Sequence, residues 1–306
     1  NIQGGVINTN LYGGGFKGLV SGNTYIDLNS GTINSDLNDG VVYGNLFGGG
    51  FEGDVNGSTN ITVNGGFISN SLYGGGYEGS VNGSTNITIN NGTISSILSD
   101  GTNKGNLYGG GYEGEVKLDT NITVNDATIY GNLYGGGYAG TINEDTTIII
   151  DNGTMENIYG GGYAGYILGN TKITINNGKI NENVYGGGYK GNVEKTTIID
   201  FYNASCQNIF GGGFEGDVEN KTQIIVNSGE IKEDIFGGGY KGLVNESNLS
   251  FNGGTIKGNV YGGGYSNDVS SNVSIVVNDI AAQQNIYGGG YAGHVKGSTS
   301  IEFYKG

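Results

Sequence analysis

The fold is decided by a stretch of sequence that recurs along the whole chain: Tyr185-Gly186-Gly187-Gly188-Tyr189-Lys190-Gly191-Asn192-Val193. Aromatic–Gly–Gly–Gly–aromatic units of this form begin at Tyr12, Phe47, Tyr73, Tyr108, Tyr134, Tyr159, Tyr185, Phe210, Phe236, Tyr261 and Tyr287. Successive units are separated by 25 or 26 residues, except for two intervals of 35 residues. Self-similarity at such a period is the signature of a repeat architecture.

The segment before each unit has the periodicity of a strand. Thr171, Ile173 and Ile175 alternate with polar residues, and the same alternation returns in residues 59–63 and 85–89. One aliphatic column precedes the first aromatic residue of each unit, and another follows the second. Short β-rich stretches separated by Gly and Asn predict an all-β fold, a single-stranded parallel β-helix (β-solenoid) of about 11 coils of 25–26 residues. We expect one domain over residues 1–306, a rod of about 50 Å at roughly 4.8 Å per coil.

In-register coils would place like residues over like. The first aromatic residues of the eleven units would then form a ring ladder, which adds roughly 0.5–1.5 kcal/mol per neighbouring pair. An asparagine column follows the alternating strand, and its amides can hydrogen-bond from coil to coil. Its clearest members are Asn64, Asn90, Asn125, Asn176, Asn227 and Asn252.

The Gly triplet allows two arrangements. It can turn a corner through positive φ, which sends Tyr189, Gly191 and Val193 inward. Alternatively it runs straight and leaves Tyr185 and Tyr189 outward, as two exposed aromatic ladders beside a smooth Gly strip. The aromatic–variable–Gly–variable–aliphatic alternation after the triplet favours the corner.

The amino-acid composition argues against most enzyme and nucleic-acid-binding functions. The 306 residues include 66 Gly, no Pro and no Trp, and 13 Lys against 28 acidic residues give a net charge of −15. A nucleic-acid partner needs a cationic footprint, so none is expected. One His, His294, and one Cys, Cys206, leave no cluster for a metal or a nucleophilic hydrolase, and we expect neither enzyme activity nor a cofactor. Cys206 shares a column with Ile180 and Ile231, which predicts a buried apolar filler.

An acidic column is the weak candidate for a site. Glu52, Glu78 and Glu113 follow the second aromatic residue of their units, and Asp54 and Glu115 share their face. A hard cation such as Ca²⁺ could bridge these carboxylates. A Glu pair one coil apart could also imitate the carboxylates of a retaining glycosidase. A solvated acidic face is the competing interpretation.

The two long intervals carry insertions at residues 34–45 and 95–106, both at one corner and two coils apart. Loops tolerate insertion and often carry binding residues. Because these coils also bear the acidic column, we expect any specific ligand at this end.

Units such as Asn183–Val193, joined to Thr171–Gly178, resemble the Gly/Asn/Thr-rich β-solenoid repeats of large bacterial surface and adhesin-like proteins. The resemblance covers the entire chain and implies a stalk, adhesive rod or filament outside the cell or on its surface, without catalytic residues. No apolar run is long enough for a membrane span.

Both ends of the sequence are repeat-like, so we expect either a longer chain or end-to-end self-association. A glycan or a cell surface is the expected external partner. The alternative function is a carbohydrate-binding or carbohydrate-cleaving β-helix that uses exposed Tyr ladders or the acidic column.

Overall fold

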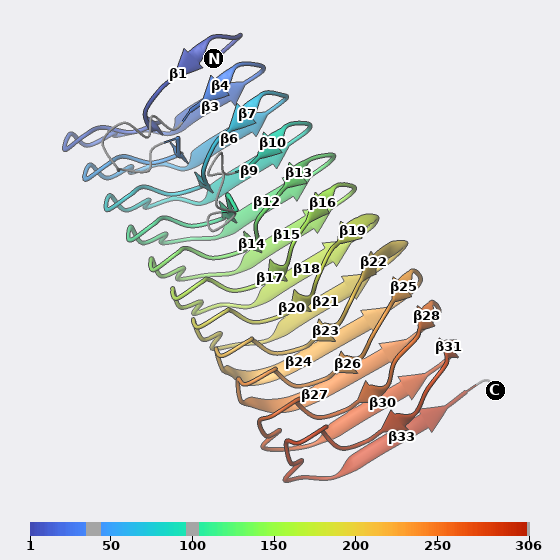
Figure 1. Cartoon of the computed structure of the whole chain (residues 1–306). Helices are drawn as coiled ribbons and strands as arrows, with labels where there is room; N and C mark the ends of the chain where they lie inside the picture. The colour runs from blue at the N-terminus through green and yellow to red at the C-terminus, as the bar shows by residue number, and fades with distance from the viewer. Residues whose placement is uncertain (35–43, 96–103, 305–306) are drawn as a thin grey trace.

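The computed structural model describes residues 1–34, 44–95 and 104–304. Its three parallel sheets, each of eleven strands, stack as a β-solenoid with the two termini at opposite ends (Figure 1). The expected all-β solenoid of about 11 coils is therefore confirmed. Over the ranges described, every regular element is a strand, and no helix there is long and apolar enough to cross a membrane.

The sheet of longest strands carries most of the coil-to-coil pairing. Its strands are β3 (Thr24–Leu28), β6 (Thr59–Val63), β9 (Thr85–Ile89), β12 (Thr120–Val124), β15 (Thr146–Ile150), β18 (Thr171–Ile175), β21 (Thr197–Phe201), β24 (Val218–Val226), β27 (Val244–Phe251), β30 (Val273–Val277) and β33 (Thr299–Phe303). Like residues face one another, as in the pairs Thr59–Thr85 and Ile61–Ile87.

The second sheet follows the asparagine corner. Its strands are β1 (Val6–Ile7), β4 (Thr32–Ile33), β7 (Phe67–Ile68), β10 (Thr93–Ile94), β13 (Thr128–Ile129), β16 (Thr154–Met155), β19 (Gly178–Ile180), β22 (Ala204–Cys206), β25 (Glu230–Ile231), β28 (Thr255–Ile256) and β31 (Ala281–Ala282). Cys206 pairs with Ile231 and is fully buried, as its column predicts. Burial raises the pKa of its thiol.

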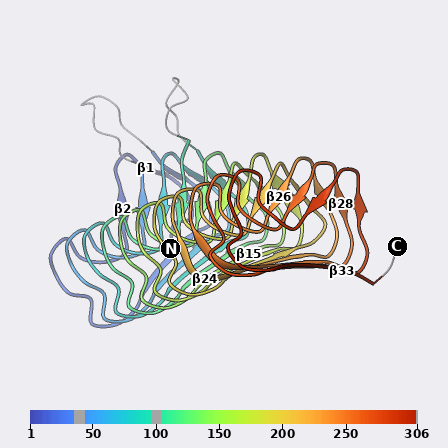
Figure 2. The ribbon, with the colours of Figure 1, turned by 90° about the horizontal axis from the view of Figure 1, so that it is seen from below.

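The third sheet leads into the Gly triplets. Its strands are β2 (Leu11–Tyr12), β5 (Leu46–Phe47), β8 (Leu72–Tyr73), β11 (Leu107–Tyr108), β14 (Leu133–Tyr134), β17 (Ile158–Tyr159), β20 (Val184–Tyr185), β23 (Ile209–Phe210), β26 (Ile235–Phe236), β29 (Val260–Tyr261) and β32 (Ile286–Tyr287). Seen from below, the coils lie one behind another with a repeated outline (Figure 2).

The interior of the solenoid is filled by the aliphatic columns. In β12, Thr120, Ile122 and Val124 are buried, while Asn121 and Thr123 face outward and are half-buried. This is the alternation that the sequence predicts for a strand with one buried face. The aliphatic residue after each Gly-rich turn joins the core through isolated parallel bridges, such as Val81 to Val116.

A buried threonine column links the long sheet to the Gly triplets. Thr59 Oγ1 donates to Gly74 O at 2.6 Å, and Thr120 Oγ1 donates to Gly135 O at 2.6 Å. Each bond satisfies a hydroxyl and a carbonyl inside the apolar core, where an unpaired polar group is costly.

The predicted asparagine column forms an exposed ladder of side-chain amides. Nδ2 of Asn90 donates to Oδ1 of Asn64 at 2.6 Å, and Nδ2 of Asn125 donates to Oδ1 of Asn90 at 2.6 Å. The ladder includes Asp151, which accepts from Asn176 at 2.6 Å. It continues beyond Tyr202, where Asn252 donates to Asn227 at 2.9 Å.

The predicted positive φ of the triplet is wrong. Among the described residues, no triplet glycine lies in that region; Gly66, Gly153 and other glycines beside the asparagine ladder do. The triplets need glycine because backbones of successive coils approach too closely for a side chain. A Cβ on Gly186 would lie 2.2 Å from Gly211 O, and one on Gly187 would lie 2.7 Å from Gly213 N.

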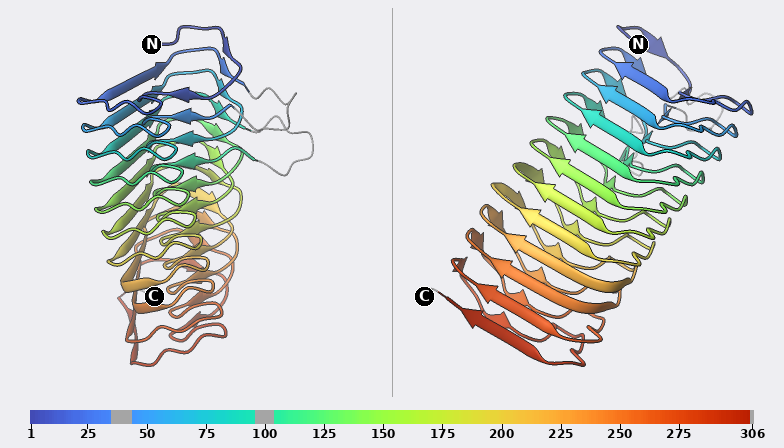
Figure 3. Two further views of the ribbon diagram at one scale, coloured as in Figure 1. Left: turned by 90° about the vertical axis from the view of Figure 1, so that its left-hand side faces the viewer. Right: turned by 180° about the vertical axis from the view of Figure 1, so that it is seen from behind.

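The insertions predicted at residues 34–45 and 95–106 lie largely outside the described residues, which include their ends at Asn34, Asn45, Ser95 and Asn106. The Gly-rich turns of successive coils lie in files along the rod (Figure 3). These files carry the aromatic residues into a second cluster, separate from the aliphatic core.

Candidate functional site

The first aromatic residues of the eleven units form what we call the inner ladder. Neighbouring rings stack nearly parallel: the Tyr73 and Tyr108 ring centroids are 4.7 Å apart with an interplanar angle of 3°. In Leu107–Tyr108 the aliphatic side chain enters the solenoid core, so the next side chain, on the opposite face, points away from it. Tyr108 is nevertheless only 3% exposed. The inner ladder therefore lies outside the solenoid interior and is covered from outside.

The cover is the outer ladder, made by the second aromatic residue of each unit. Its rings also stack, with the Tyr112 and Tyr138 centroids 4.7 Å apart at 2°. Between ladders the contact is edge-on, as in Tyr108 and Tyr138 at 6.1 Å and 79°. Because the Gly triplet bends the chain back, the outer ring of one coil packs on the inner ring of its neighbour.

This arrangement corrects both interpretations of the triplet. Tyr185, which the straight version placed on the surface, is 3% exposed, whereas Val193 is buried as the corner predicts. Tyr189 packs on the inner ladder instead of entering the aliphatic core. Since the ring faces of both ladders are occupied by neighbouring rings, only ring edges and hydroxyls face outward along the rod. A flat surface for stacking sugars is therefore absent from the described part of these ladders.

A second polar ladder runs beside the inner ladder, which we call the rim ladder. It occupies the position two residues before the inner aromatic residue: Asn10, Asn45, Ser71, Asn106, Asn132, Asn157, Asn183, Asn208, Asp234, Asn259 and Asn285. Residues two apart in a strand share a face, so the amides and the inner rings emerge on the same side. Sequence reasoning missed this ladder, although Asn recurs at a fixed distance before the triplet.

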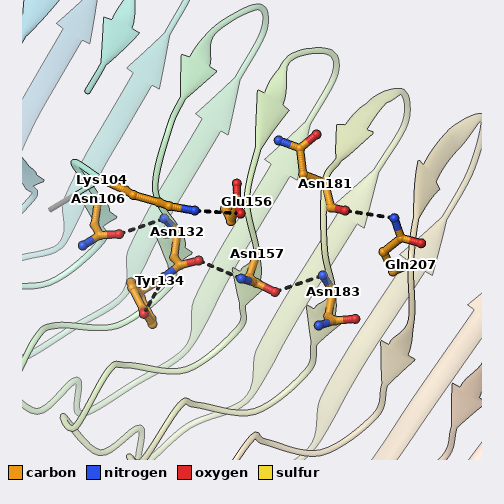
Figure 4. A network of polar contacts seen from close by, with 9 residues as sticks. All are labelled: Lys104, Asn106, Asn132, Tyr134, Glu156, Asn157, Asn181, Asn183 and Gln207. Atoms are coloured by element: carbon orange, nitrogen blue, oxygen red, sulfur yellow. Dashed lines mark hydrogen bonds and ion pairs between the residues drawn. The ribbon is translucent and has the colours of Figure 1, made fainter. Parts of the chain in front are cut away.

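Hydrogen bonds hold the rim ladder in register (Figure 4). Asn157 Nδ2 donates to Asn132 Oδ1 at 2.9 Å, and the Asn183 backbone N–H donates to Asn157 Oδ1 at 2.9 Å. Asn132 Nδ2 also donates to the Tyr134 hydroxyl at 3.1 Å. The amides thus fix both the coil spacing and the hydroxyls of the inner ladder.

The rim and the two aromatic ladders line a groove of about 610 Å³ that spans several coils. The inner ladder contributes Phe47, Tyr73, Tyr108 and Tyr134. The outer ladder contributes Tyr77, Tyr112, Tyr138 and Tyr163. The rim ladder contributes Asn45, Ser71, Asn106 and Asn132, and Asn70 beside it also lines the groove. The lining therefore contains hydroxyls, amides and ring edges and no charged side chain.

Burial also changes the pKa of several groove tyrosines. Desolvation raises the pKa of Tyr108 and of Tyr134 above the usual value, because the low-dielectric cluster disfavours the phenolate. Desolvation raises the pKa of Tyr112 in the outer ladder as well. These hydroxyls therefore remain neutral hydrogen-bond donors and acceptors at neutral pH.

The position beside the rim ladder varies along the rod. Three residues before the inner aromatic, the coils from Asn45 to Tyr134 carry Gly44, Asn70, Gly105 and Gly131, the next four carry Glu156, Glu182, Gln207 and Glu233, and the last two carry Gly258 and Gln284. Glu156 Oε1 lies 2.9 Å from Lys104 Nζ, so the first long side chain of this column is held across the rim (Figure 4). Uncharged residues therefore stand beside the rim from Gly44 to Gly131, and Glu156, which shares its coil with Tyr163, is the first carboxylate at this position.

The acidic column does not assemble into a metal site. Over the described ranges, no group of three or more His, Cys, Asp or Glu side chains could hold a metal ion, so the candidates Glu52, Asp54, Glu78, Glu113 and Glu115 form no such group. Their partners are local: Glu52 Oε2 lies 3.1 Å from Lys17 Nζ, and Glu115 pairs with Lys117. Glu52, Glu78 and Glu113 sit in successive coils and face solvent.

The insertions and the groove meet, although sequence reasoning linked the insertions to the acidic column. Asn45 and Asn106, the C-terminal ends of the two insertions, both line the groove. At this end, where we expect any specific ligand, the groove is lined by neutral side chains.

Comparison of the chain with protein-family models, with curated proteins and with solved structures finds no match. The geometry described above is therefore the basis for assigning a function.

Proposed function

We propose that this chain is an extracellular structural or adhesive β-solenoid, a segment of a cell-surface stalk or filament. The observation that supports the proposal is the uninterrupted stacking of eleven coils through three in-register sheets. Almost every repeated side chain is used to join one coil to the next, in the threonine, asparagine and aromatic columns. Such a rod transmits load along its axis and presents the same surface at every coil.

End-to-end association is part of this proposal. The last strand, β33, is exposed at all five positions, and Phe16 and Tyr291 at the two ends of the outer ladder are 66% and 60% exposed. Internal coils bury the corresponding surfaces against their neighbours. A further coil, from additional chain or from a second copy, would continue the three sheets and both ring ladders in register.

The alternative drawn from the sequence divides into two parts. Carbohydrate cleavage by Glu52, Glu78 or Glu113 is the less favoured part, because these side chains are exposed and do not line the groove. Carbohydrate binding keeps a specific candidate location in the groove between the rim and outer ladders.

Surface labelling of intact cells with an antibody raised against the whole chain tests the location. We expect labelling before permeabilisation and electron micrographs of the native material that show rods or continuous fibres. Labelling that appears only after permeabilisation would contradict a surface role. Light scattering of the purified chain at rising concentration tests the end-to-end contact, which strictly monodisperse monomers would exclude.

A further inference from the structure

We propose that the groove between the rim and outer ladders binds a linear, neutral glycan that runs parallel to the rod axis. This inference concerns a ligand site and does not depend on the location of the protein. The groove is lined by Tyr, Phe, Asn and Ser alone, in a chain whose net charge is −15. A lining without a charged side chain offers a charged ligand no ion-pair partner, and the negative net charge of the chain disfavours an anionic one.

The lining matches the hydrogen-bonding groups of a sugar. Tyr hydroxyls and Asn amides both donate and accept, as each sugar hydroxyl does. The inner hydroxyls are oriented by the rim, since Asn106 Nδ2 donates to the Tyr108 hydroxyl at 3.3 Å and Asn132 Nδ2 to that of Tyr134 at 3.1 Å. Ring edges of the outer ladder supply apolar contact beside these polar groups.

The direction of the ligand follows from the repeat. Equivalent lining groups recur once per coil, and the inner rings that mark this spacing are 4.7–4.9 Å apart from Phe47 to Tyr134. A polymer with regularly spaced hydroxyls can therefore meet the same groups in successive coils. The described lining extends from Phe47 to Tyr163, four coil steps or about 20 Å along the axis.

The later coils show why the site is local. Phe210 and Phe236 replace inner tyrosines and remove their hydroxyls, while Glu182 and Glu233 border the rim. Asn208 Nδ2 is bound to Glu233 Oε2 at 2.8 Å and is therefore engaged by a carboxylate. The coils of Phe210 and Phe236 thus lack the inner hydroxyls and carry charged side chains nearby.

The test uses the whole chain and neutral gluco- and xylo-oligosaccharides of increasing length, with a uronate oligosaccharide for comparison. Because the chain has no Trp, its intrinsic fluorescence reports on the tyrosines directly. We expect binding of at least one neutral series and weaker binding of the uronate. The affinity should rise with oligosaccharide length until the ligand is longer than the groove, about 20 Å. No binding of any neutral oligosaccharide at millimolar concentration would overturn the proposal.

A matched pair of variants locates the binding. The triple variant Tyr112→Phe, Tyr138→Phe and Tyr163→Phe removes three groove hydroxyls and keeps the rings, and Phe51 and Phe214 already occupy this ladder. We expect it to weaken binding at least tenfold, because each lost hydrogen bond lowers the affinity. The control Tyr189→Phe, Tyr240→Phe and Tyr265→Phe makes the same change outside the groove and should bind as the unmodified chain does.

Two results would contradict the assignment. An equal loss of affinity in both triple variants would place the sugar elsewhere. Sugar-free association of the unmodified chain that disappears only in the groove variant would identify a second copy as the occupant. Circular dichroism of both variants checks that the sheets are retained.

Discussion

The coils from Asn45 to Tyr163 and the coils after them share one backbone frame and differ at one rim. Both regions stack Gly triplets at the same close approach and align the same three sheets. In the first region Gly105 and Gly131 stand beside the rim ladder, and in the second Glu182 and Glu233 stand at the same position. The comparison teaches that a solenoid separates its frame from its surface: invariant columns hold the coils, and variable columns change the surface beside them.

The largest expected effect tests whether the frame is common to both regions. Gly135→Ala and Gly211→Ala each place a Cβ 2.2 Å from a backbone oxygen of the next coil. The backbone cannot move away at either position without disrupting the coil-to-coil pairing. We therefore expect each substitution to lower the free energy of unfolding by about 3 kcal/mol or more. Chemical denaturation measures the change.

The control for this pair is Gly18→Ala, where a Cβ meets no atom within 4 Å. It should change the free energy of unfolding by less than about 0.5 kcal/mol. Markedly unequal losses for Gly135→Ala and Gly211→Ala would show that the two regions do not share one frame.

The next effect compares two positions of the threonine column, Thr120 and Ser247. Thr120→Val leaves Gly135 O without its buried donor, so we expect a loss of about 1–3 kcal/mol in the free energy of unfolding. Within the part of the chain that the structure describes, the Ser247 hydroxyl at the equivalent later position is buried without a partner. Ser247→Ala should therefore be neutral or stabilising, by up to about 1 kcal/mol. Thermal melting of both variants checks the difference, and equal losses would contradict it.

Alkaline pH sharpens the contrast between tyrosine and phenylalanine in the inner ladder. Burial raises the pKa of Tyr108 and Tyr134 in the folded chain, so their contribution to stability is complete below the unfolded pKa near 10 and is lost as the pH rises toward the folded value. Over this range, each of the two tyrosines lowers the free energy of unfolding by up to ~1.4 kcal/mol per pH unit.

Replacing both tyrosines by phenylalanine, as at Phe210 and Phe236, should make the melting temperature fall less steeply above about pH 10. Melting curves recorded across that range measure the slope. Tyr25→Phe, at a ring that is 70% exposed, is the control. A slope unchanged by the double replacement would show that the inner hydroxyls do not resist ionisation.

The smallest effect concerns the charged column after the outer ladder. Glu215 Oε1 and Lys241 Nζ are 3.1 Å apart in adjacent coils, whereas Glu52, Glu78 and Glu113 place like charges in adjacent coils. Lys241→Glu should destabilise the chain and Glu78→Lys should stabilise it, each by a few tenths of a kcal/mol at low salt. Melting temperatures at low and high salt measure both, and an effect that survives high salt would not be electrostatic.

The sequence alone determined the frame of this protein. The period of the Gly triplets, the alternation of Thr171, Ile173 and Ile175, and the aliphatic columns predict the coil and its buried face, because a parallel stack places each residue over its counterpart. The exposed asparagine ladder followed from the same rule. The rim ladder was equally readable, since Asn106, Asn132 and their equivalents stand at a fixed distance before each triplet.

Only the tertiary structure decided what the triplets and aromatic residues do. Periodicity gives the face of a strand but not the course of a Gly-rich bend, which is set by the approach of one backbone to the next. That bend lays the outer ladder over the inner one, so the ring faces are occupied and a groove is lined by both ladders and the rim. The groove depends on contact between three segments in space. The sequence pattern does not show that these segments come into contact.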